Sequence, residues 1–276
     1  MSLQIAALNS GSNGNCYYIG NENEAVLIDA GISCREVEKR MKNIGLSIRK
    51  VKAIFVTHEH SDHIKGIPSI VKKYSIPVYL STPTHHQIHL RLKRATVIPF
   101  RAYEDISIGA ISIKPFPVPH DAADPHNFIV SNEVVKFGVF TDIGTLNHHV
   151  IQNFRECHAA ILESNYDEEM LETGRYPVML KNRIRGGQGH LSNSQAAKLL
   201  VDYKPAFMSH LLLGHLSKNN NKPEIVESLF KSLSGDTRVI IASRYKESEV
   251  YTISSKSDTA AIPSYRSSNP VQLKLF

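Results

Sequence analysis

The seven residues from Thr57 to His63 concentrate side chains that bind metal ions. His58, His60 and His63 supply imidazoles, and Asp62 supplies a carboxylate. Imidazole together with carboxylate suits zinc, manganese or iron better than calcium or magnesium. In an extended turn, His58 and His60 point to one side, whereas Asp62 and His63 are carried round to another. The segment therefore predicts a centre for two divalent metal ions, with zinc preferred over manganese or iron. A surface turn that happens to be rich in histidine is the alternative.

The elements on either side of this turn predict its position in the fold. Residues 51–56 form a short apolar run with the length and β-branching of a buried strand. Apolar residues at 64, 67, 70 and 71 recur at helical spacing, which predicts one helix to about Lys73. The turn therefore lies where the carboxyl end of a strand meets a helix, the place at which open α/β sheets bind their ligands.

The rest of the chain reads as short strands alternating with amphipathic helices, an α/β pattern. Strands are expected at residues 3–8, 16–19, 25–28, 76–80, 106–108, 111–116, 128–131, 134–140, 159–162, 206–211, 238–242 and 249–253. Helices are expected between Ser33 and Gly45, from Thr82, from Gly144, over 194–201 and over 223–233. The basic segment that leads up to Arg185 shows no regular pattern.

Two carboxylates directly follow predicted strands. Asp29 ends the run 25–28, and Asp142 follows the run 134–140. Each could cap a helix. A carboxylate at the position of Asp142 could instead bridge two ions held about 3.5–4 Å apart. The strand pattern alone does not decide between these roles.

Histidines elsewhere in the chain compete for the remaining ligand positions. His120 lies in a proline-bounded loop after a strand, which suits a ligand of the first ion, and His126 at the start of the next strand is its competitor. We assign His85, His86 and His89 to a solvated helix rather than to a metal site, because arginine and lysine follow them. These three therefore do not enter the predicted centre.

The sequence Gly-His-Leu-Ser occurs twice, and its two histidines invite different roles. His215 follows a strand and can complete the ligands of the second ion. His210, which we expect to be buried in that strand beside the site, is the alternative ligand. His190 begins a helix, so it can reach substrate oxygens without binding metal.

Composition limits the class of protein. The chain has 276 residues, of which 42% are hydrophobic, enough for a sizeable core. Its three cysteines, Cys16, Cys34 and Cys157, are widely spaced and odd in number, which argues against a disulfide framework. The sequence shows neither a basic leader nor a run of about 20 apolar residues, so we expect a cytoplasmic protein without a membrane span. A net charge of +6 favours a polyanionic partner.

The pattern His-x-His-x-Asp-His over residues 58–63 resembles the signature of the metallo-β-lactamase superfamily. The family's other motifs follow in order over residues 29–215, and flanking strands extend the likeness to about residue 253. The resemblance implies a four-layer αββα sandwich and a hydrolase domain over residues 1–253. Residues 254–276, rich in serine, threonine, aspartate, proline and asparagine, then read as a flexible tail.

The resemblance also implies roles for the candidate residues. The implied metal ligands are His58, His60 and His120 for the first ion, Asp62, His63 and His215 for the second, and Asp142 for both. Asp29 would orient the ligand loop, and Asp62 would also orient the nucleophile. His190 matches a histidine that, in phosphodiesterases including transfer-RNA processing nucleases, acts on the phosphate or leaving group without binding metal.

Within the superfamily the chain resembles the bacterial YycJ (WalJ) group. The similarity lies in the opening Gly-Ser loop, the string His-Asp-Ala-x-Asp-Pro from His120, and the paired Gly-His-Leu-Ser strings. Too few residues separate Asp142 from His190 for the large extra domain of the RNA-cleavage and DNA-interstrand-repair branch. The resemblance implies a DNA exonuclease of replication or repair that uses a metal-bound hydroxide. The alternatives are a thioester or lactone hydrolase, or a non-catalytic, metal-stabilised adaptor.

Two further segments suggest partners. Lys181, Arg183 and Arg185 lie close to His190 in sequence and could steer a nucleic-acid backbone, although a solvated basic face is the alternative. The last five residues resemble the pentapeptide with which many bacterial replication and repair proteins dock onto the sliding clamp: Gln272, Leu273, Lys274, Leu275 and Phe276. An apolar tail cluster without a partner is the other interpretation. Oligomeric state and the choice between DNA and RNA stay open.

Overall fold

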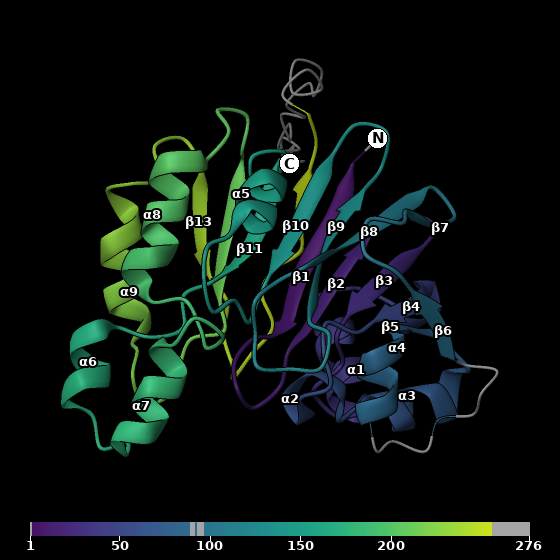
Figure 1. Ribbon diagram of the computed structural model, residues 1–276. Helices are drawn as coiled ribbons and strands as arrows, with labels where there is room; N and C mark the ends of the chain where they lie inside the picture. Colours follow the sequence, from purple (N-terminus) through teal and green to yellow (C-terminus); the bar gives the residue numbers. More distant parts are fainter. Residues whose placement is uncertain (1, 89–91, 93–96, 256–276) are drawn as a thin grey trace, which may run out of the picture.

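Two seven-stranded sheets form the centre of the molecule (Figure 1). The computed structural model describes residues 2–88, 92 and 97–255. The first sheet has the order β14 (Tyr251–Ile253), β1 (Leu3–Asn9), β2 (Cys16–Gly20), β3 (Ala25–Ile28), β4 (Val51–Phe55), β5 (Val78–Ser81) and β6 (Val97–Phe100). The second has the order β13 (Arg238–Ile241), β12 (His210–Gly214), β11 (Ala159–Glu163), β10 (Lys136–Phe140), β9 (His126–Ser131), β8 (Ile111–Pro117) and β7 (Ile106–Ile108).

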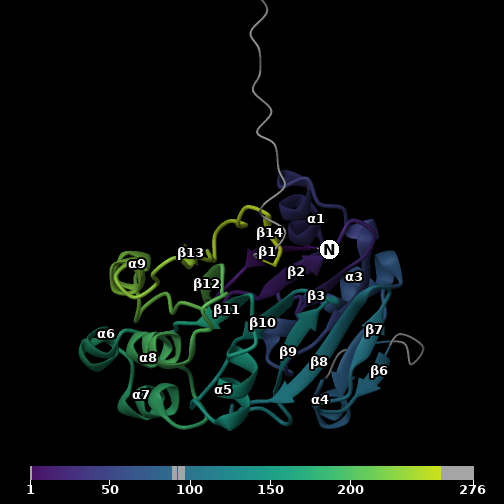
Figure 2. The ribbon, with the colours of Figure 1, turned by 90° about the horizontal axis from the view of Figure 1, so that it is seen from above.

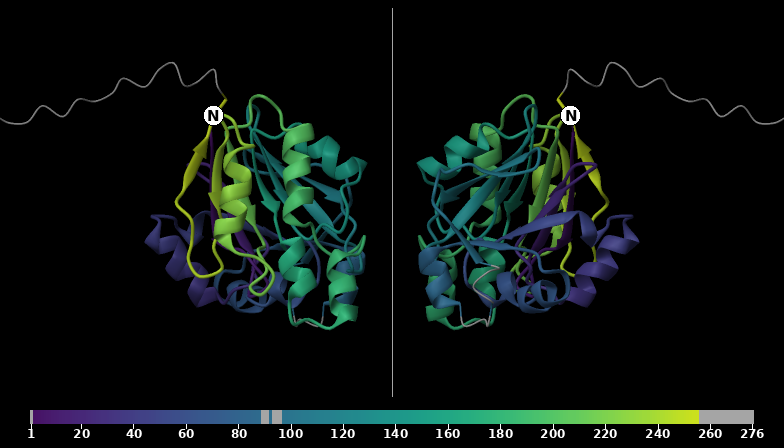
Figure 3. Two further views of the ribbon diagram at one scale, coloured as in Figure 1. Left: turned by 90° about the vertical axis from the view of Figure 1, so that its left-hand side faces the viewer. Right: turned by 90° about the vertical axis from the view of Figure 1, so that its right-hand side faces the viewer.

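Helices cover the outer face of each sheet. Figure 2 shows α1 (Cys34–Asn43) and α3 (Ile67–Tyr74) outside the first sheet, and α5 (His148–Phe154), α8 (Asn193–Tyr203) and α9 (Pro223–Lys231) outside the second. The side views in Figure 3 show the same order of layers. The shorter helices are η1 (Ile48–Lys50), α2 (Ser61–Ile64), α4 (Thr82–Gln87), α6 (Glu168–Thr173) and α7 (Val178–Arg185). This is the αββα sandwich, so the predicted fold class is confirmed.

Apolar side chains from both sheets form the core between them. Phe55 of β4 stacks on Tyr79 of β5, with ring centroids 4.6 Å apart, and meets Phe128 of β9 edge-on at 5.7 Å. Phe55 and Phe128 belong to a cluster of buried residues drawn from both sheets, and the partly buried Tyr79 packs against this cluster. Burying such apolar surface is the main source of folding stability, so this core fixes how the two sheets face each other.

The strand directions bring several carboxyl ends to one edge of the sandwich. In the first sheet, β3 and β4 are parallel, and β1 points the same way because β2 is antiparallel to both β1 and β3. In the second, β10, β11 and β12 are parallel, and β8 points with them because β9 is antiparallel to both β8 and β10. The loops that follow these strands therefore start along one shared edge.

Several predicted elements are wrong in their bounds. The single helix over residues 64–73 is two helices, α2 and α3, because the N–H of Gly66 donates to Ala30 and a Cβ there would overlap the Ile32 carbonyl. The irregular basic segment is the helix α7, and the strand predicted at 206–211 is β12 at His210–Gly214. Strand β6 was not predicted.

The starts of two helices decide the positions of His190 and Asp142. α8 begins at Asn193, one residue before the predicted helix over 194–201, behind a capping box made by Ser192 and Gln195. His190 therefore lies in the loop before this helix and does not begin it. α5 begins at His148 and is capped by Asn147. Asp142 therefore does not cap a helix, which removes one of its two alternative roles.

Some predictions concern parts of the chain without described structure. His89 and the tail motif from Gln272 to Phe276 lie outside the described residues. Cys16, Cys34 and Cys157 are buried free thiols, which agrees with the expectation of no disulfide. Among the described residues, no helix has the length and apolar character needed to cross a membrane.

Candidate metal centre

Three imidazoles from two loops converge on one point. His58 and His60 follow β4, and His120 lies in the loop between β8 and β9. His60 Nδ1 lies 2.9 Å from His58 Nε2 and 3.4 Å from His120 Nε2. His120 Nδ1 is 2.9 Å from the Gly189 carbonyl oxygen, which fixes the proton on Nδ1 and leaves Nε2 free. The three facing nitrogens lie within 4.8 Å of one another and could hold one ion.

A second set of potential ligands lies beside the first. Asp62 and His63 come from α2, and His215 directly follows β12. His63 Nε2 and His215 Nε2 each lie 3.6 Å from Asp62 Oδ2. His215 Nε2 is buried and has no hydrogen-bond partner among the residues that the structure describes. A buried polar atom without a partner is costly, and a cation held by this set would satisfy it.

The carboxylate of Asp142 lies between the two sets. Its Oδ2 is 3.2 Å from His63 Nε2, and its Oδ1 is 3.8 Å from His120 Nε2. Asp142 also forms a potential metal-binding group with His58 and His63. The structure thus brings together the seven residues that the resemblance implies as metal ligands.

Three residues of the centre have left-handed backbone conformations. The φ angles are 60° at Asp29, 54° at Asp142 and 55° at His215. Each residue follows the end of a strand by one or two positions. Such conformations cost on the order of 1–3 kcal/mol each and concentrate at functional sites. The sharp turns they make direct the side chains into the centre instead of continuing the strands.

Asp29 sets the orientation of two ligand rings. Its Oδ2 lies 2.7 Å from His63 Nδ1 and accepts the Thr57 hydroxyl at 2.9 Å. The hydroxyl oxygen of Thr57 is in turn 2.9 Å from His58 Nδ1. Because Thr57 donates to Asp29, its oxygen can accept from His58, so both rings carry protons on Nδ1 and lone pairs on Nε2. Hydrogen bonds of this kind hold metal-binding histidines in the ligand tautomer.

Glu163 at the end of β11 joins the centre to His190. Its Oε1 lies 2.7 Å from His190 Nδ1 and 2.9 Å from His215 Nδ1. Its Oε2 accepts the backbone N–H groups of Ile143, at 2.8 Å, and Leu191, at 3.2 Å. One buried carboxylate therefore receives four hydrogen bonds. His190 and His215 are left with Nε2 as the atom available for other partners.

Glu163 and Asn15 also belong to the centre, although neither was predicted from the sequence. Asn15 Nδ2 lies 3.0 Å from His63 Nε2 and donates to Asp62 Oδ2 at 3.4 Å, while its Oδ1 accepts the Tyr17 hydroxyl at 3.1 Å. The sequence position of Glu163 could have identified it, because Glu163 follows an apolar run as Asp29 and Asp142 do. The position of Asn15 could not, because its loop has the composition of an ordinary turn.

The charges in the centre fit divalent cations. Burial opposes a positive charge on His215, yet the Asp142 carboxylate raises its pKa to about 10. Burial lowers the pKa of His58 well below its usual range, and burial lowers that of His120 as well. His58 and His120 therefore offer neutral imidazoles, the form that binds metal. The second set contains or adjoins four buried or partly buried carboxylates, whose negative charge a cation would offset: Asp29, Asp62, Asp142 and Glu163.

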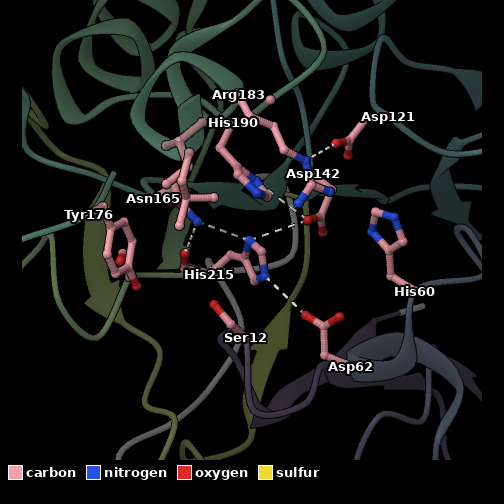
Figure 4. Close-up of a pocket in the computed structure, with 14 residues that line it drawn as sticks. Ser12, His60, Asp62, Asp121, Asp142, Asn165, Tyr176, Arg183, His190 and His215 are labelled. Atoms are coloured by element: carbon pink, nitrogen blue, oxygen red, sulfur yellow. Dashed lines mark hydrogen bonds and ion pairs between the residues drawn. The ribbon is translucent and has the colours of Figure 1, made fainter. Parts of the chain in front are cut away.

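Both sets open into a pocket of about 290 Å³ (Figure 4). Its lining includes His60, Asp62, Asp121, Asp142, Tyr176, Arg183, His190 and His215. Arg183 is ion-paired with Asp121 at this pocket. Lys181 contacts the Glu172 carbonyl, and Arg185 pairs with the Glu172 carboxylate at 2.8 Å. Of the three basic candidates, the structure therefore places Arg183 alone at the pocket.

The competing histidines lie elsewhere. His126 packs edge-on against Phe100, and its Nδ1 is 2.9 Å from the Asp124 carbonyl oxygen. His210 begins β12, at the opposite end of the strand from the centre, and its ring packs on Tyr251. The expectation that His210 lies beside the site is therefore wrong. His85 and His86 are exposed on α4.

Known proteins share this architecture. Residues 24–215 match the beta-lactamase superfamily domain. The chain is 37% identical to exodeoxyribonuclease YycJ from Bacillus anthracis, over 82% of this chain and 86% of that protein. It is 30% identical to exodeoxyribonuclease WalJ from Streptococcus pneumoniae, with the same shares covered. The crystal structure of the metallo-beta-lactamase fold protein YhfI from Bacillus subtilis matches with a TM-score of 0.70 at 15% identity, over 91% of this chain and 100% of YhfI.

The matched domain covers most of the chain, and the two exodeoxyribonucleases align along most of their own lengths. The αββα layers and the histidine and aspartate clusters at one edge agree with that match. The resemblance drawn from the sequence is confirmed: the chain belongs to the beta-lactamase superfamily, as a metal-dependent hydrolase with the metallo-β-lactamase fold and with similarity to the YycJ and WalJ proteins.

Proposed function

We propose that this chain is an exonuclease that hydrolyses phosphodiester bonds of DNA, in replication or repair, with two bound divalent metal ions. Zinc is the expected metal, with manganese or iron as alternatives. The observation that carries the proposal is a single pocket where two adjacent ligand sets meet the imidazole of His190 and the guanidinium of Arg183. The names of the relatives YycJ and WalJ, both exodeoxyribonucleases, support a nucleic-acid substrate and favour DNA.

Each ligand would have a defined task. The first ion would be held by His58, His60 and His120, the second by Asp62, His63 and His215, and both by Asp142. When bound, the ions would supply Lewis acidity and a water molecule of lowered pKa. The side chain of Asp62 is 22% exposed, compared with 4% for Asp142 and 0% for Asp29. Asp62 Oδ1 would orient the attacking water. Asp29 would hold the imidazoles of His58 and His63 in place.

His190 would act on the departing oxygen. Burial opposes a positive charge on this imidazole, but the Glu163 carboxylate raises its pKa. Because His190 Nδ1 is bonded to Glu163, the proton at Nε2 is the one available to the pocket. A positioned imidazolium can donate that proton to, or hydrogen-bond, the oxygen that leaves phosphorus. Arg183 would bind a phosphate oxygen, because guanidinium groups form strong hydrogen bonds with phosphate.

Two substitutions test the proposal on end-labelled single- and double-stranded DNA and RNA, with protein of known metal content. His60→Ala should abolish hydrolysis, because it removes one nitrogen from the first ligand set. His190→Ala should retain two metal ions per chain by elemental analysis and lose about 10²–10⁴-fold in kcat. His210→Ala is the matched control, because this histidine lies at the far end of β12. Full turnover by His60→Ala would rule out the mechanism.

The same assay separates the alternatives. A thioester or lactone hydrolase would cleave a thioester substrate faster than any nucleic acid. A non-catalytic adaptor would bind metal and show no turnover of either substrate. Release of mononucleotides from one labelled end would identify an exonuclease and its polarity, whereas internal fragments would identify an endonuclease.

We also propose that the tail binds a bacterial sliding clamp. The support is its sequence, because Gln272 and the apolar residues Leu273, Leu275 and Phe276 form a short motif after a polar segment. Deleting residues 272–276 should remove clamp binding in a pull-down and leave activity on short oligonucleotides unchanged. Clamp binding by the truncated chain would contradict this part of the proposal.

A further inference from the structure

A second cavity, of about 270 Å³, adjoins the catalytic pocket. Its walls are the loop that follows β12, the start of α9 and the segment that follows β13. Ser217 lines both cavities. Ser10 lines the second cavity, and its hydroxyl accepts the backbone N–H of His215 at 2.8 Å. The second cavity therefore lies directly against the residue that completes the second ligand set.

Arg244 lies beside the segment that the two cavities share. It lines the second cavity, and its guanidinium donates to the carbonyl oxygen of Leu216, the residue before Ser217. Tyr245 also lines the second cavity, whereas Tyr176 lines the catalytic pocket.

The lining of the second cavity combines apolar, aromatic and cationic groups. Its apolar residues are Leu216, Pro223, Ile241 and Ala242. Tyr245 stands at the cavity with 73% of its surface exposed, and the exposed Lys218 adds a second positive charge. Among the described residues that line this cavity there is no carboxylate, whereas Asp62, Asp121 and Asp142 line the catalytic pocket.

This chemistry fits a segment of single-stranded nucleic acid. Sites for single strands combine a positively charged groove for the backbone with aromatic side chains on which bases stack. The catalytic pocket holds the proposed metal ligands and Arg183, which suit the scissile phosphate. The adjoining cavity offers a tyrosine ring and apolar walls for a base, with Lys218 and Arg244 for an adjacent phosphate.

We propose that the second cavity binds the nucleoside next to the scissile phosphodiester, with its base against the ring of Tyr245 and an adjacent phosphate near Lys218. The inference rests on the proposed function, since it names the neighbouring part of the same substrate. Stacking accepts any base. The cavity therefore supplies affinity for a strand without selecting its sequence.

Calorimetry on the metal-loaded full chain tests this directly. The probes are thymidine 3′,5′-bisphosphate and its abasic counterpart, because neither contains a diester that can be cleaved. The wild type should bind the base-containing probe about tenfold more tightly, the usual scale for one stacked base. Tyr245→Ala should abolish that preference. Lys218→Ala should weaken binding of both probes and reduce its salt dependence.

Exposed residues outside both cavities supply the matched controls. Tyr103→Ala removes a ring that is 48% exposed, and Lys246→Ala removes an exposed ammonium. Both variants should bind as the wild type does. Equal affinity of the wild type for the two probes, or a base preference that survives in Tyr245→Ala, would overturn the inference.

The outcome is separable from that of the proposed function. A base preference that depends on Tyr245, found in a protein that does not cleave DNA, would support the nucleoside site and contradict the exonuclease proposal. DNA cleavage by a protein that binds both probes equally would support the proposed nuclease activity and contradict the nucleoside site.

Discussion

Glu163 connects the proposed metal ligand His215 to the proposed acid His190. Its Oε1 faces the Nδ1 atoms of His190 and His215, and its Oε2 faces two backbone N–H groups. All four partners are donors, so both oxygens must accept. An amide cannot replace this carboxylate in either orientation, because its NH₂ group would face two donors at a buried position.

We therefore expect Glu163→Gln to weaken metal binding and to lower turnover. Loss of a partner that orients a ligand typically costs 10–100-fold in metal affinity or activity. A titration against a competing chelator, with kcat measured at saturating metal, checks both effects. Glu156→Gln is the control, because Glu156 pairs with Lys136 on the surface away from the centre. Unchanged metal affinity in Glu163→Gln would show that His215 does not depend on this carboxylate.

At the scale of elements, the position of a strand is predicted best where a short apolar run has polar residues on both sides. β3, β4 and β11 satisfy this condition, and their ends place Asp29, His58 and Glu163. β12 was misplaced because the chain is largely apolar from residue 206 to 216, and pairing with β11 decides which part becomes the strand. The pattern of apolar and polar residues also does not determine the direction of a side chain in a loop. The contacts of the Asn15 amide could therefore not be predicted.

The break between α2 and α3 has a cause that can be tested. Gly66 donates its N–H to Ala30 and lies against the carbonyl of Ile32, so an added methyl group has no space. Gly66→Ala should lower the free energy of unfolding by about 3 kcal/mol. Urea denaturation measures this as a lower midpoint. Because the same contact holds α2 against the loop after β3, the variant should also weaken metal binding.

Gly45 supplies the matched control for that experiment. A Cβ at Gly45 would meet nothing within 4 Å, although its φ of 74° lies in the left-handed region. Gly45→Ala should therefore cost only the backbone strain of about 1–2 kcal/mol. Gly66 has a φ of −83°, which any residue adopts, so Gly66→Ala adds no such strain. A loss in Gly66→Ala no larger than the loss in Gly45→Ala would show that the space beside Ile32 accepts a methyl group.

At the scale of the whole molecule, the two ligand sets join the two halves of the sandwich. His58, His60, Asp62 and His63 follow β4 of the first sheet, whereas His120, Asp142 and His215 follow strands of the second. Bound ions would therefore act as ties between sheets that otherwise meet through apolar packing. A ligand that binds only the folded state stabilises it in proportion to the logarithm of its concentration over Kd.

Removing the metal should therefore lower the stability of the entire fold as well as abolish the catalytic activity. At a metal concentration of about 100 Kd the stabilisation is about 2.7 kcal/mol, or roughly 5–10 °C in Tm. Thermal unfolding of metal-loaded and chelator-treated protein measures this difference. His60→Ala and His215→Ala, which remove one ligand from opposite sheets, should each reduce it. His126→Ala should lower both melting temperatures and preserve their difference, because His126 is buried outside the ligand sets. If instead His126→Ala erased the metal-dependent difference while His60→Ala kept it, the ligands would have been assigned to the wrong imidazoles and the ties between the sheets would lie elsewhere.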